Sequence, residues 1–288
     1  RHIADLVARY TRKTAGSKAF TERHRKVLAD PRAVSGFRAE WKEMIYQIVT
    51  DRSGGSRLWD IDGNTYIDFL NGFGPTFLGH RSDLVVEAVR AQLDKGFEIG
   101  PQTALAGEVA DLVCELTGNE RATFCNTGSE AVMAAMRIAR CVTGRDRIVM
   151  FSGSYHGQFD EVLVKRGGRS GAERALPAAP GIPSPNVGSM MVLEYADPAA
   201  LDWIRAHGDE IAAVIVEPVQ SRHPGLCPTE FLQALRALTE AAEIALIFDE
   251  VVTGFRMHPG GMQTVLGIRA DMATYGKVVG GGMPIGIL

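Results

Sequence analysis

A single lysine, Lys277, stands in a glycine-rich stretch, with Gly276 before it and Gly280–Gly282 shortly after it. Most lysines are solvated, but weakly polar, glycine-dense flanks predict an amine held away from water. Desolvation lowers the pKa of an amine, and such a lysine can act as a Schiff-base nucleophile. The glycines also leave room for a flat ligand close to the backbone. The stretch therefore predicts a reactive lysine beside a planar ligand.

Two acidic residues, Asp249 and Glu250, follow the apolar run Ala245–Phe248. An acid at the end of a buried strand is unfavourable unless it has a partner. A metal ion would need further carboxylate or histidine ligands, and the surrounding sequence offers none, so no metal is predicted. A protonated ring nitrogen of a bound ligand suits Asp249 better.

Polar residues also follow two other apolar runs. Glu217 and Gln220 are candidates for contacts with a ligand, although Pro218 alone could end the strand and Glu217 could be a hydrogen-bonded structural residue. Tyr155 could lie flat on a planar ligand. His156 could act as an acid or base, or could be structural.

The segment from Asn126 to Ser129 connects a short apolar run to a helix pattern. Gly128 allows the backbone to approach a ligand closely. Ser129 lies at the start of the helix, where N–H groups and the helix dipole favour an anion. A phosphate site is one interpretation, and an ordinary helix cap is the alternative.

Taken together, these patterns are far more specific than any one of them. A phosphate site at a helix start, a strand-end acid, an aromatic residue and a later lysine predict a site for pyridoxal 5'-phosphate (PLP). The aspartate would keep the pyridine nitrogen protonated, so that the ring withdraws electrons from the substrate carbon.

The elements that must position these residues alternate along the chain. Apolar strand patterns are separated by helix patterns from about residue 121 onward. This alternation is typical of βαβ units and predicts an α/β fold, with three layers around a mostly parallel sheet. Ligands bind at the carboxyl ends of such strands, where the polar residues above fall. The stretch Lys165–Ser189, rich in Gly, Pro and Ala, predicts a long surface loop.

The N-terminal part has another pattern. The charged, helix-like segment to about Pro31 is expected to be a peripheral arm or the end of a linker. The alternating stretch Arg57–Leu70, with Asp62-Gly63-Asn64 at its centre, predicts a hairpin. We expect two domains: residues 1–100 with the arm, the hairpin and a helix, and residues 101–288 with the PLP site.

Two helices are expected between the hairpin and the alternating region. Ser82 would cap the first helix, which ends at Gly96. The second helix would run from Thr103 to Leu116 and end near Gly118.

Composition excludes some classes of function. The chain has 288 residues and a net charge of −3, so no strong basic field would recruit nucleic acid. No apolar run is long enough to span a bilayer. The four cysteines show no C-x-x-C spacing, which favours a reducing, cytoplasmic setting.

Five ordered stretches resemble the class III aminotransferases of PLP fold type I: FCNTGSEAVMAAMRIAR, SYHG, VEPVQ, IFDEVVTGFR and YGKVVGGGMPIG. Their spacing matches as well as their content, and the resemblance covers roughly Val34 to Leu288. It implies that the catalytic residues are Lys277, Asp249 and Tyr155. It implies that the cofactor contacts are Thr127, Gly128, Ser129, Tyr155, His156, Glu217, Gln220, Asp249, Val251 and Lys277.

The same resemblance implies a role for most of these side chains. Lys277 would bond covalently to PLP and then shuttle protons, and Asp249 would pair with the pyridine nitrogen. Val251 and Tyr155 would cover opposite faces of the ring. Of the polar residues, Gln220 would approach the ring hydroxyl, Gly128 and Ser129 would hold the phosphate, and Glu217 would belong to the surrounding network.

Within this family, two groups share further stretches with the chain. The aminotransferase domains built into polyketide and peptide synthetases share GFEIGPQ and FRMHPGGMQ, and are the better match. They imply an amino-acid donor, a β-ketoacyl thioester acceptor and an acyl carrier protein as partner. Glutamate-1-semialdehyde 2,1-aminomutase shares WDIDGNTYIDF and is the alternative. A non-catalytic interaction module with this fold is less favoured, because Lys277, Asp249 and Tyr155 are all present.

The resemblance also implies parts of the enzyme beyond the PLP contacts. Class III enzymes continue into a small C-terminal domain, and a homodimer partner supplies a phosphate-binding threonine, so the chain is expected to lack part of the complete enzyme. Arg38 and Phe73 are the predicted substrate-binding residues. Counting back from the hairpin places Arg38 level with an aminomutase arginine that binds a substrate carboxylate. An arginine suits that role because it presents two parallel donors.

Overall fold

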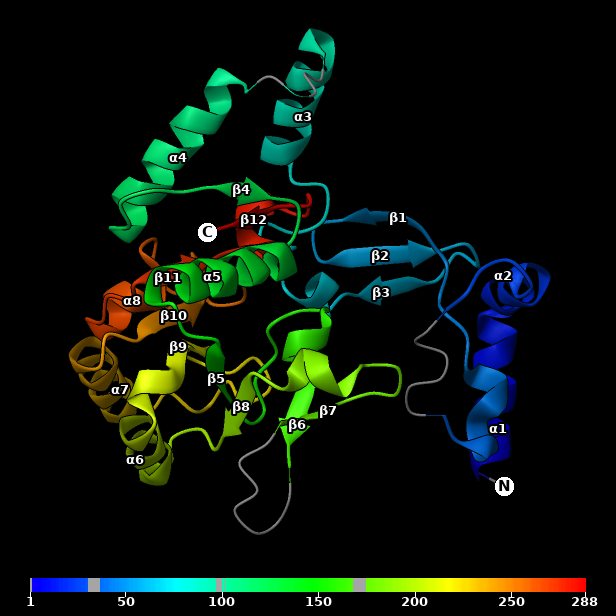
Figure 1. Cartoon of the computed structure of the whole chain (residues 1–288). Helices are drawn as coiled ribbons and strands as arrows, with labels where there is room; N and C mark the ends of the chain where they lie inside the picture. The colour runs from blue at the N-terminus through cyan, green and yellow to red at the C-terminus, as the bar shows by residue number, and fades with distance from the viewer. Residues whose placement is uncertain (1, 31–36, 97–99, 101, 168–174) are drawn as a thin grey trace. The chain divides into compact units, whose positions relative to one another are not determined.

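The computed structural model describes residues 2–30, 37–96, 100, 102–167 and 175–288. The chain forms two compact units, Arg1–Phe97 and Glu98–Leu288, and each is described by itself (Figure 1). Among the described residues, no helix is both long enough and apolar enough to span a lipid bilayer.

The first unit contains the predicted hairpin. Strands β2 and β3 pair antiparallel on either side of the turn at Gly63, as predicted. A further strand, β1, pairs antiparallel with β2 and makes a three-stranded sheet. The elements of this unit are α1 (His2–Lys13), α2 (Ala15–His24), η2 (Ala39–Met44), β1 (Thr50–Gly54), β2 (Arg57–Asp60), β3 (Thr65–Ile67), η3 (Asn71–Phe73) and α3 (Asp83–Lys95).

The predicted arm forms helices α1 and α2, which attach to the hairpin of the same unit. The Asp62 carboxylate, in the hairpin turn, accepts hydrogen bonds from the backbone N–H groups of Gly16 (2.6 Å) and Ser17 (3.1 Å). The Thr14 and Tyr46 hydroxyls share a buried hydrogen bond of 2.7 Å. Asp62 therefore caps the start of α2 from a distant part of the sequence, since Thr14 makes no side-chain cap there.

Replacing Asp62 by alanine should loosen α2. The change removes the acceptor for two N–H groups at a helix start, so the free energy of local opening of α2 should fall by about 1–2 kcal/mol. Native-state amide hydrogen exchange of residues 15–17 would measure it. Asp51→Ala, at an exposed acid on β1, is the matched control. Equal exchange in the two variants would contradict the capping role.

Two predicted helices are present at nearly the predicted bounds. Helix α3 ends at Gly96, but Ser82 makes no side-chain hydrogen bond to it, so the predicted serine cap is wrong. Helix α4 (Ala104–Thr117), in the second unit, ends at Gly118, whose φ of 75° is the left-handed conformation that favours glycine.

The second unit is built on a five-stranded sheet in the order β11-β10-β9-β5-β8. Every pairing described in this sheet is parallel, which confirms the predicted α/β class. The edge strand β11 was not predicted. The strands are β5 (Arg147–Phe151), β8 (Met190–Leu193), β9 (Ile211–Val216), β10 (Ala245–Asp249) and β11 (Met272–Thr274).

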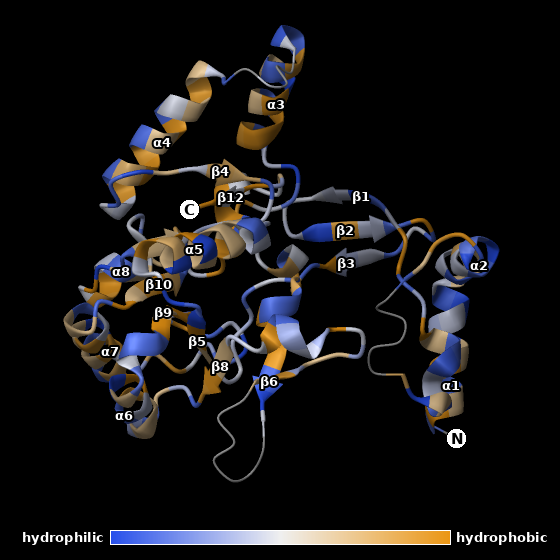
Figure 2. Ribbon diagram, viewed as in Figure 1, coloured by the Kyte–Doolittle hydropathy of each residue, from blue (hydrophilic) through white to orange (hydrophobic). Residues whose placement is uncertain are grey.

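Helices cover both faces of this sheet and give the predicted three layers (Figure 1). On β5, Ile148 and Met150 pack with α5 (Gly128–Thr143). The alternating residues Val149 and Phe151 pack on the opposite face with α6 (Pro198–Ala206) and α7 (Thr229–Ala241). This alternation is the two-residue period of a strand buried on both sides. Strands β8 and β9 are accordingly apolar along their length (Figure 2).

Two predictions about the second unit need correction. The stretch Lys165–Ser189 is not an unbroken surface loop: β6 (Val164–Arg166) pairs antiparallel with β7 (Ala175–Pro177), and η5 (Ser184–Val187) follows. Residues 168–174 lie outside the described residues. The apolar run before α5 forms only the short strand β4 (Phe124–Cys125), which pairs antiparallel with β12 (Gly286–Ile287) and stays outside the main sheet. The remaining short elements are η4 (Asp160–Val162), η6 (Gly208–Glu210), η7 (Lys277–Gly280) and α8 (Gly261–Leu266).

Candidate active site

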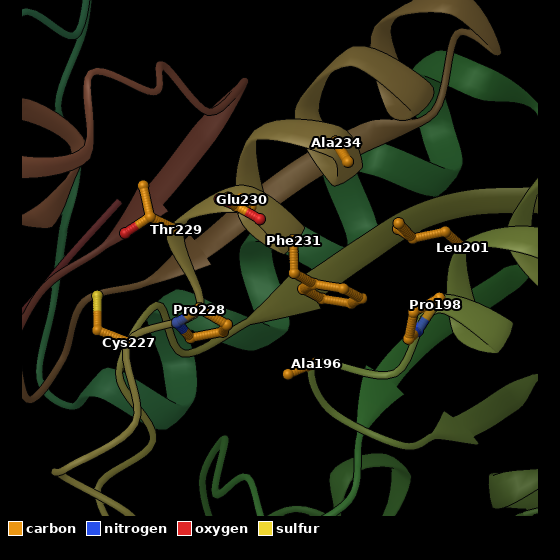
Figure 3. A pocket seen from close by; sticks show the side chains of 9 residues that line it. All are labelled: Ala196, Pro198, Leu201, Cys227, Pro228, Thr229, Glu230, Phe231 and Ala234. Atoms are coloured by element: carbon orange, nitrogen blue, oxygen red, sulfur yellow. The ribbon is translucent and has the colours of Figure 1, made fainter.

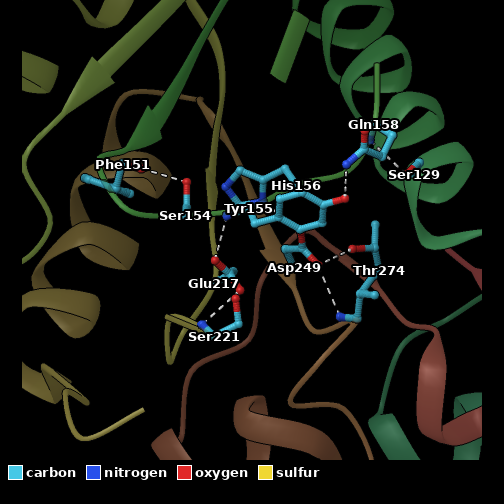
Figure 4. Close-up of polar contacts among 11 residues, drawn as sticks. Ser129, Phe151, Ser154, Tyr155, His156, Gln158, Glu217, Ser221, Asp249 and Thr274 are labelled. Carbon is cyan, nitrogen blue, oxygen red and sulfur yellow. Dashed lines mark hydrogen bonds and ion pairs between the residues drawn. The ribbon is translucent and has the colours of Figure 1, made fainter. Parts of the chain in front are cut away.

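The predicted site residues of the second unit gather around the carboxyl ends of the parallel strands. β5, β9 and β10 run in the same direction, so the segments that follow them emerge at one edge of the sheet. Figure 4 shows that residues from these segments are joined by hydrogen bonds. This is the edge at which ligands bind in α/β proteins.

Asp249 lies at the centre of this group and is 4% exposed. One carboxylate oxygen, Oδ2, is 2.7 Å from His156 Nδ1. The other accepts hydrogen bonds from the backbone N–H of Val251 (3.1 Å) and the Thr274 hydroxyl (3.3 Å). An ionised carboxylate only accepts, so His156 Nδ1 carries the hydrogen. His156 Nε2 is buried and has no hydrogen-bond partner among the described residues.

The segment that carries Tyr155 is held by the loop after β9. The Glu217 carboxylate accepts from the backbone N–H groups of Tyr155 (2.8 Å) and Ser221 (3.1 Å). Gln220 donates its side-chain N–H to the Ser152 carbonyl (2.8 Å). Burial raises the pKa of Glu217, an effect that the nearby His156 opposes. Glu217 and Gln220 therefore fix the segment after β5, and the predicted contact of Gln220 with a ring hydroxyl stays a prediction.

Lys277 follows β11 and begins η7. Its φ of 48° is left-handed, a conformation that costs a residue other than glycine about 1–2 kcal/mol and is found at functional sites. Burial lowers the pKa of the Lys277 amine, and the carboxylates of Asp249 and Glu217 oppose that shift. Both carboxylates therefore act electrostatically on the amine. Its lowered pKa is the property expected of a nucleophilic lysine.

The space beside Gly128 and Gly276 is occupied by the side chain of Val251. A Cβ at Gly128 would lie 2.7 Å from Val251 Cγ2, and one at Gly276 would lie 3.3 Å from Val251 Cγ1. Val251 therefore sits against the start of α5 and the residue before Lys277. The close packing of these three segments requires glycine at position 128.

The start of α5 is capped by Thr127, not by Ser129. The Thr127 hydroxyl accepts from the Glu130 N–H (3.2 Å), and the Glu130 carboxylate accepts from the Thr127 N–H (2.9 Å). The segment Asn126–Ser129 is therefore an ordinary helix cap, as one of the two interpretations predicted, but its capping residue is Thr127 and Ser129 lies in the first turn of the helix. The Ser129 hydroxyl instead accepts from the backbone N–H of Gln158 (3.2 Å).

Two contacts at this edge were not anticipated. Glu250, next to Asp249, is fully buried and accepts from the backbone N–H groups of Met262 (2.7 Å) and Gln263 (3.2 Å). It is structural, and burial raises its pKa. Gln158 donates its side-chain N–H to the Tyr155 hydroxyl (2.6 Å). The polar residue directly after SYHG is the only sequence signal that could have pointed to Gln158.

Arg38 and Phe73 belong to the first unit. Arg38 is exposed, and its guanidinium lies 5.4 Å from the centre of the Trp41 ring. Phe73 is 66% exposed and has a left-handed φ of 63°. Their predicted roles in substrate binding stay predictions.

A shallow pocket lies where α6 and α7 begin (Figure 3). None of the predicted site residues lines it, so it is separate from the group around Asp249. Its lining residues are Ala196, Pro198, Leu201, Cys227, Pro228, Thr229, Glu230, Phe231 and Ala234.

Known proteins match both the sequence and the fold. Glutamate-1-semialdehyde 2,1-aminomutase of Chloroflexus aggregans is 43% identical over 243 residues, which cover 83% of this chain and 55% of that protein. An ω-transaminase from Sphaerobacter thermophilus has a TM-score of 0.85 and 35% identity, over 94% of this chain and 63% of its own. A transaminase with PLP bound has a TM-score of 0.83 and 35% identity, over 95% and 64%. The chain thus spans about half the length of the curated relative.

The family profile described as Aminotransferase class-III matches residues 37–288. That range includes the strand ends, the start of α5 and the lysine that follows β11. Sequence, fold and the grouping of the polar side chains agree, and the chain belongs to the class III aminotransferase family.

Proposed function

We propose that this chain binds PLP through Lys277 and moves amino groups at the site around Asp249. The observation that carries the proposal is the grouping of four features at one edge of the sheet. These are the Lys277 amine with a lowered pKa, the buried pair of Asp249 and His156, the fixed Tyr155 segment, and the start of α5 at Ser129. The solved transaminase with PLP bound supports this choice of cofactor.

The residues present fit PLP on the chemistry of their side chains. A buried carboxylate such as Asp249 has lone pairs beyond those used by His156, Thr274 and Val251, so it can accept from a pyridinium N–H as well. His156 Nε2, buried and without a hydrogen-bond partner in the part of the chain that the structure describes, is a further polar atom at the same place. The helix start at Ser129 suits a phosphate.

When bound, PLP supplies a ring that withdraws electrons from the substrate carbon. Asp249 would hold a hydrogen at the ring nitrogen, and His156 would keep the carboxylate in position. Tyr155 and Val251 would cover the two faces of the ring, and Gly128 and Ser129 would bind the phosphate. Lys277 Nζ, whose pKa burial lowers, would in its neutral form accept the proton from the substrate carbon and hold it for return.

For the substrate, we propose aminomutase-type chemistry in place of the predicted amination of a β-ketoacyl thioester on a carrier protein. The curated relative reported above is an aminomutase at 43% identity, whereas the two solved transaminases are 35% identical. In such chemistry the amino group moves between two carbons of one small molecule. The amino-acid donor, the carrier protein and the homodimer stay predictions.

A substrate test separates the two possibilities. The PLP-loaded protein would be given glutamate-1-semialdehyde alone, or an amino acid together with a β-ketoacyl thioester, and the products would be identified by mass spectrometry. An isomer with the amino group moved from C2 to C1, without added donor, supports the aminomutase proposal. Turnover only with the amino-acid donor and the thioester would instead support amination of a β-ketoacyl thioester on a carrier protein.

Lys277 should be the lysine that becomes covalently attached to PLP. Its amine is the one with a lowered pKa at this edge of the sheet. Borohydride reduction of the PLP-bound protein, followed by peptide mapping, should place the label on Lys277. Label at Lys165, which is exposed and lies on β6, measures non-specific reaction. Label mainly on another lysine would refute the assignment.

A further inference from the structure

Gln158 makes one hydrogen bond through its backbone and another through its side chain. Its backbone N–H donates to the Ser129 hydroxyl (3.2 Å), and its side-chain N–H donates to the Tyr155 hydroxyl (2.6 Å) (Figure 4). One residue thus contacts both the start of α5 and the aromatic side chain at the strand edge. Neither contact is needed to complete a helix or a strand.

The first of these bonds depends on Gly157. A Cβ at Gly157 would lie 2.5 Å from the Ser129 Oγ, and its φ of 123° disfavours any other residue. The backbone therefore runs directly against the first turn of α5. This close approach is what brings the Gln158 N–H to Ser129.

The second bond anchors the hydroxyl of a ring that is only partly buried. Tyr155 is 37% exposed, so neighbouring atoms cover only part of its side chain. Its backbone N–H is bound to Glu217 (2.8 Å), and the next residue, His156, is bound to Asp249 (2.7 Å). With the main chain fixed, rotation about the two side-chain torsions is the remaining freedom, and the Gln158 amide restricts it at the far end of the ring.

We propose that Gln158 is a positioning residue that ties the Tyr155 hydroxyl to the Ser129 end of α5 before any ligand binds. This inference rests on the proposed function, in which the Tyr155 ring covers PLP and Ser129 binds its phosphate. The ring and the phosphate site are then set at a fixed spacing. The side-chain entropy of Tyr155 is lost on folding and not on binding, and this pre-organisation strengthens binding.

A double-mutant cycle tests the hydrogen bond between Gln158 and the Tyr155 hydroxyl. Gln158→Leu keeps the bulk of the side chain but removes the donor, and should weaken PLP binding between about 2-fold and 10-fold, the cost of ordering one side chain. In a Tyr155→Phe background the same change should have little effect, because the acceptor is already gone. Gln233→Leu, at an exposed glutamine on α7, is the matched control. PLP affinity would be measured by absorbance titration.

A second measurement uses the protein without cofactor. Amide hydrogen exchange over residues 152–158 should be at least about 3-fold faster in Gln158→Leu than in the wild type, and unchanged in Gln233→Leu. If the wild type fails to bind PLP, the proposed function fails, while this exchange still tests the tie. Equal loss of affinity in both backgrounds, or unchanged exchange in Gln158→Leu, would overturn the positioning role.

Discussion

Lys277→Ala should nearly abolish amino-group transfer. The change removes the proposed covalent attachment point for PLP, which is also the amine proposed to move the substrate proton. Loss of a positioned acid–base group alone lowers a rate by about 10²–10⁴-fold. We therefore expect a fall at the upper end of that range or beyond it, measured as single-turnover conversion followed by the absorbance of the cofactor.

The control for this experiment is Lys165→Ala, which removes an exposed lysine of the same unit. Lys277→Arg keeps a positive charge at the site but cannot bond to PLP, and should be as inactive as the alanine variant. Added methylamine could restore part of the proton transfer in Lys277→Ala, since it supplies a free amine. A near-normal rate in either Lys277 variant would remove the basis of the proposed function.

Asp249→Asn should slow the reaction about 10²–10³-fold while leaving much of the PLP binding intact, as for other strong electrostatic contacts in catalysis. The amide is close in size to the carboxylate but carries no charge to hold a hydrogen at the pyridine nitrogen. Half-reaction rates at saturating PLP would measure it. Asp209→Asn, at an exposed acid of the same unit, is the control.

The pH dependence of PLP attachment gives this variant a second readout. The amine reacts when neutral, so attachment is slow below the Lys277 pKa and fast above it. In the wild type, burial already lowers that pKa, and the Asp249 charge raises it in part. Removing the charge should therefore move the profile of Asp249→Asn to lower pH. A profile that stays in place, together with a normal half-reaction, would show that Asp249 does not act on this site.

The sheet was largely predictable because its central strands carry an unmistakable pattern. β9 and β10 are almost wholly apolar runs, and only strands covered on both faces have this composition. β11 was missed because Met272–Thr274 is too short to show any period. β6 and β7 were missed because Gly and Pro nearby favour a loop, while their pairing depends on contacts between distant residues.

The sequence could predict which residues belong to the site and which strand ends carry them. It could not predict which of these residues contact one another. Lys277 and Asp249 stand out because a cation among glycines and an acid after an apolar strand both need partners. Gly128 packs against Val251, and the Ser129 hydroxyl accepts a hydrogen bond from Gln158. Neither contact can be recognised from the neighbouring sequence. The carboxylates Asp249 and Glu250 look alike in sequence, and their different contacts, to His156 and to the α8 backbone respectively, separate their roles.

The short pair of β4 with β12 has a consequence for the order in which the protein assembles. It joins the segment before α5 to the segment after Lys277, and nearby Asn119 donates to the Tyr275 hydroxyl across 156 positions of sequence. Contacts between such distant residues form late, because the chain between them must first become compact. We expect a growing polypeptide to complete β5 to β11 before the lysine reaches the helix start. Capture of PLP would then report that folding of this unit has finished.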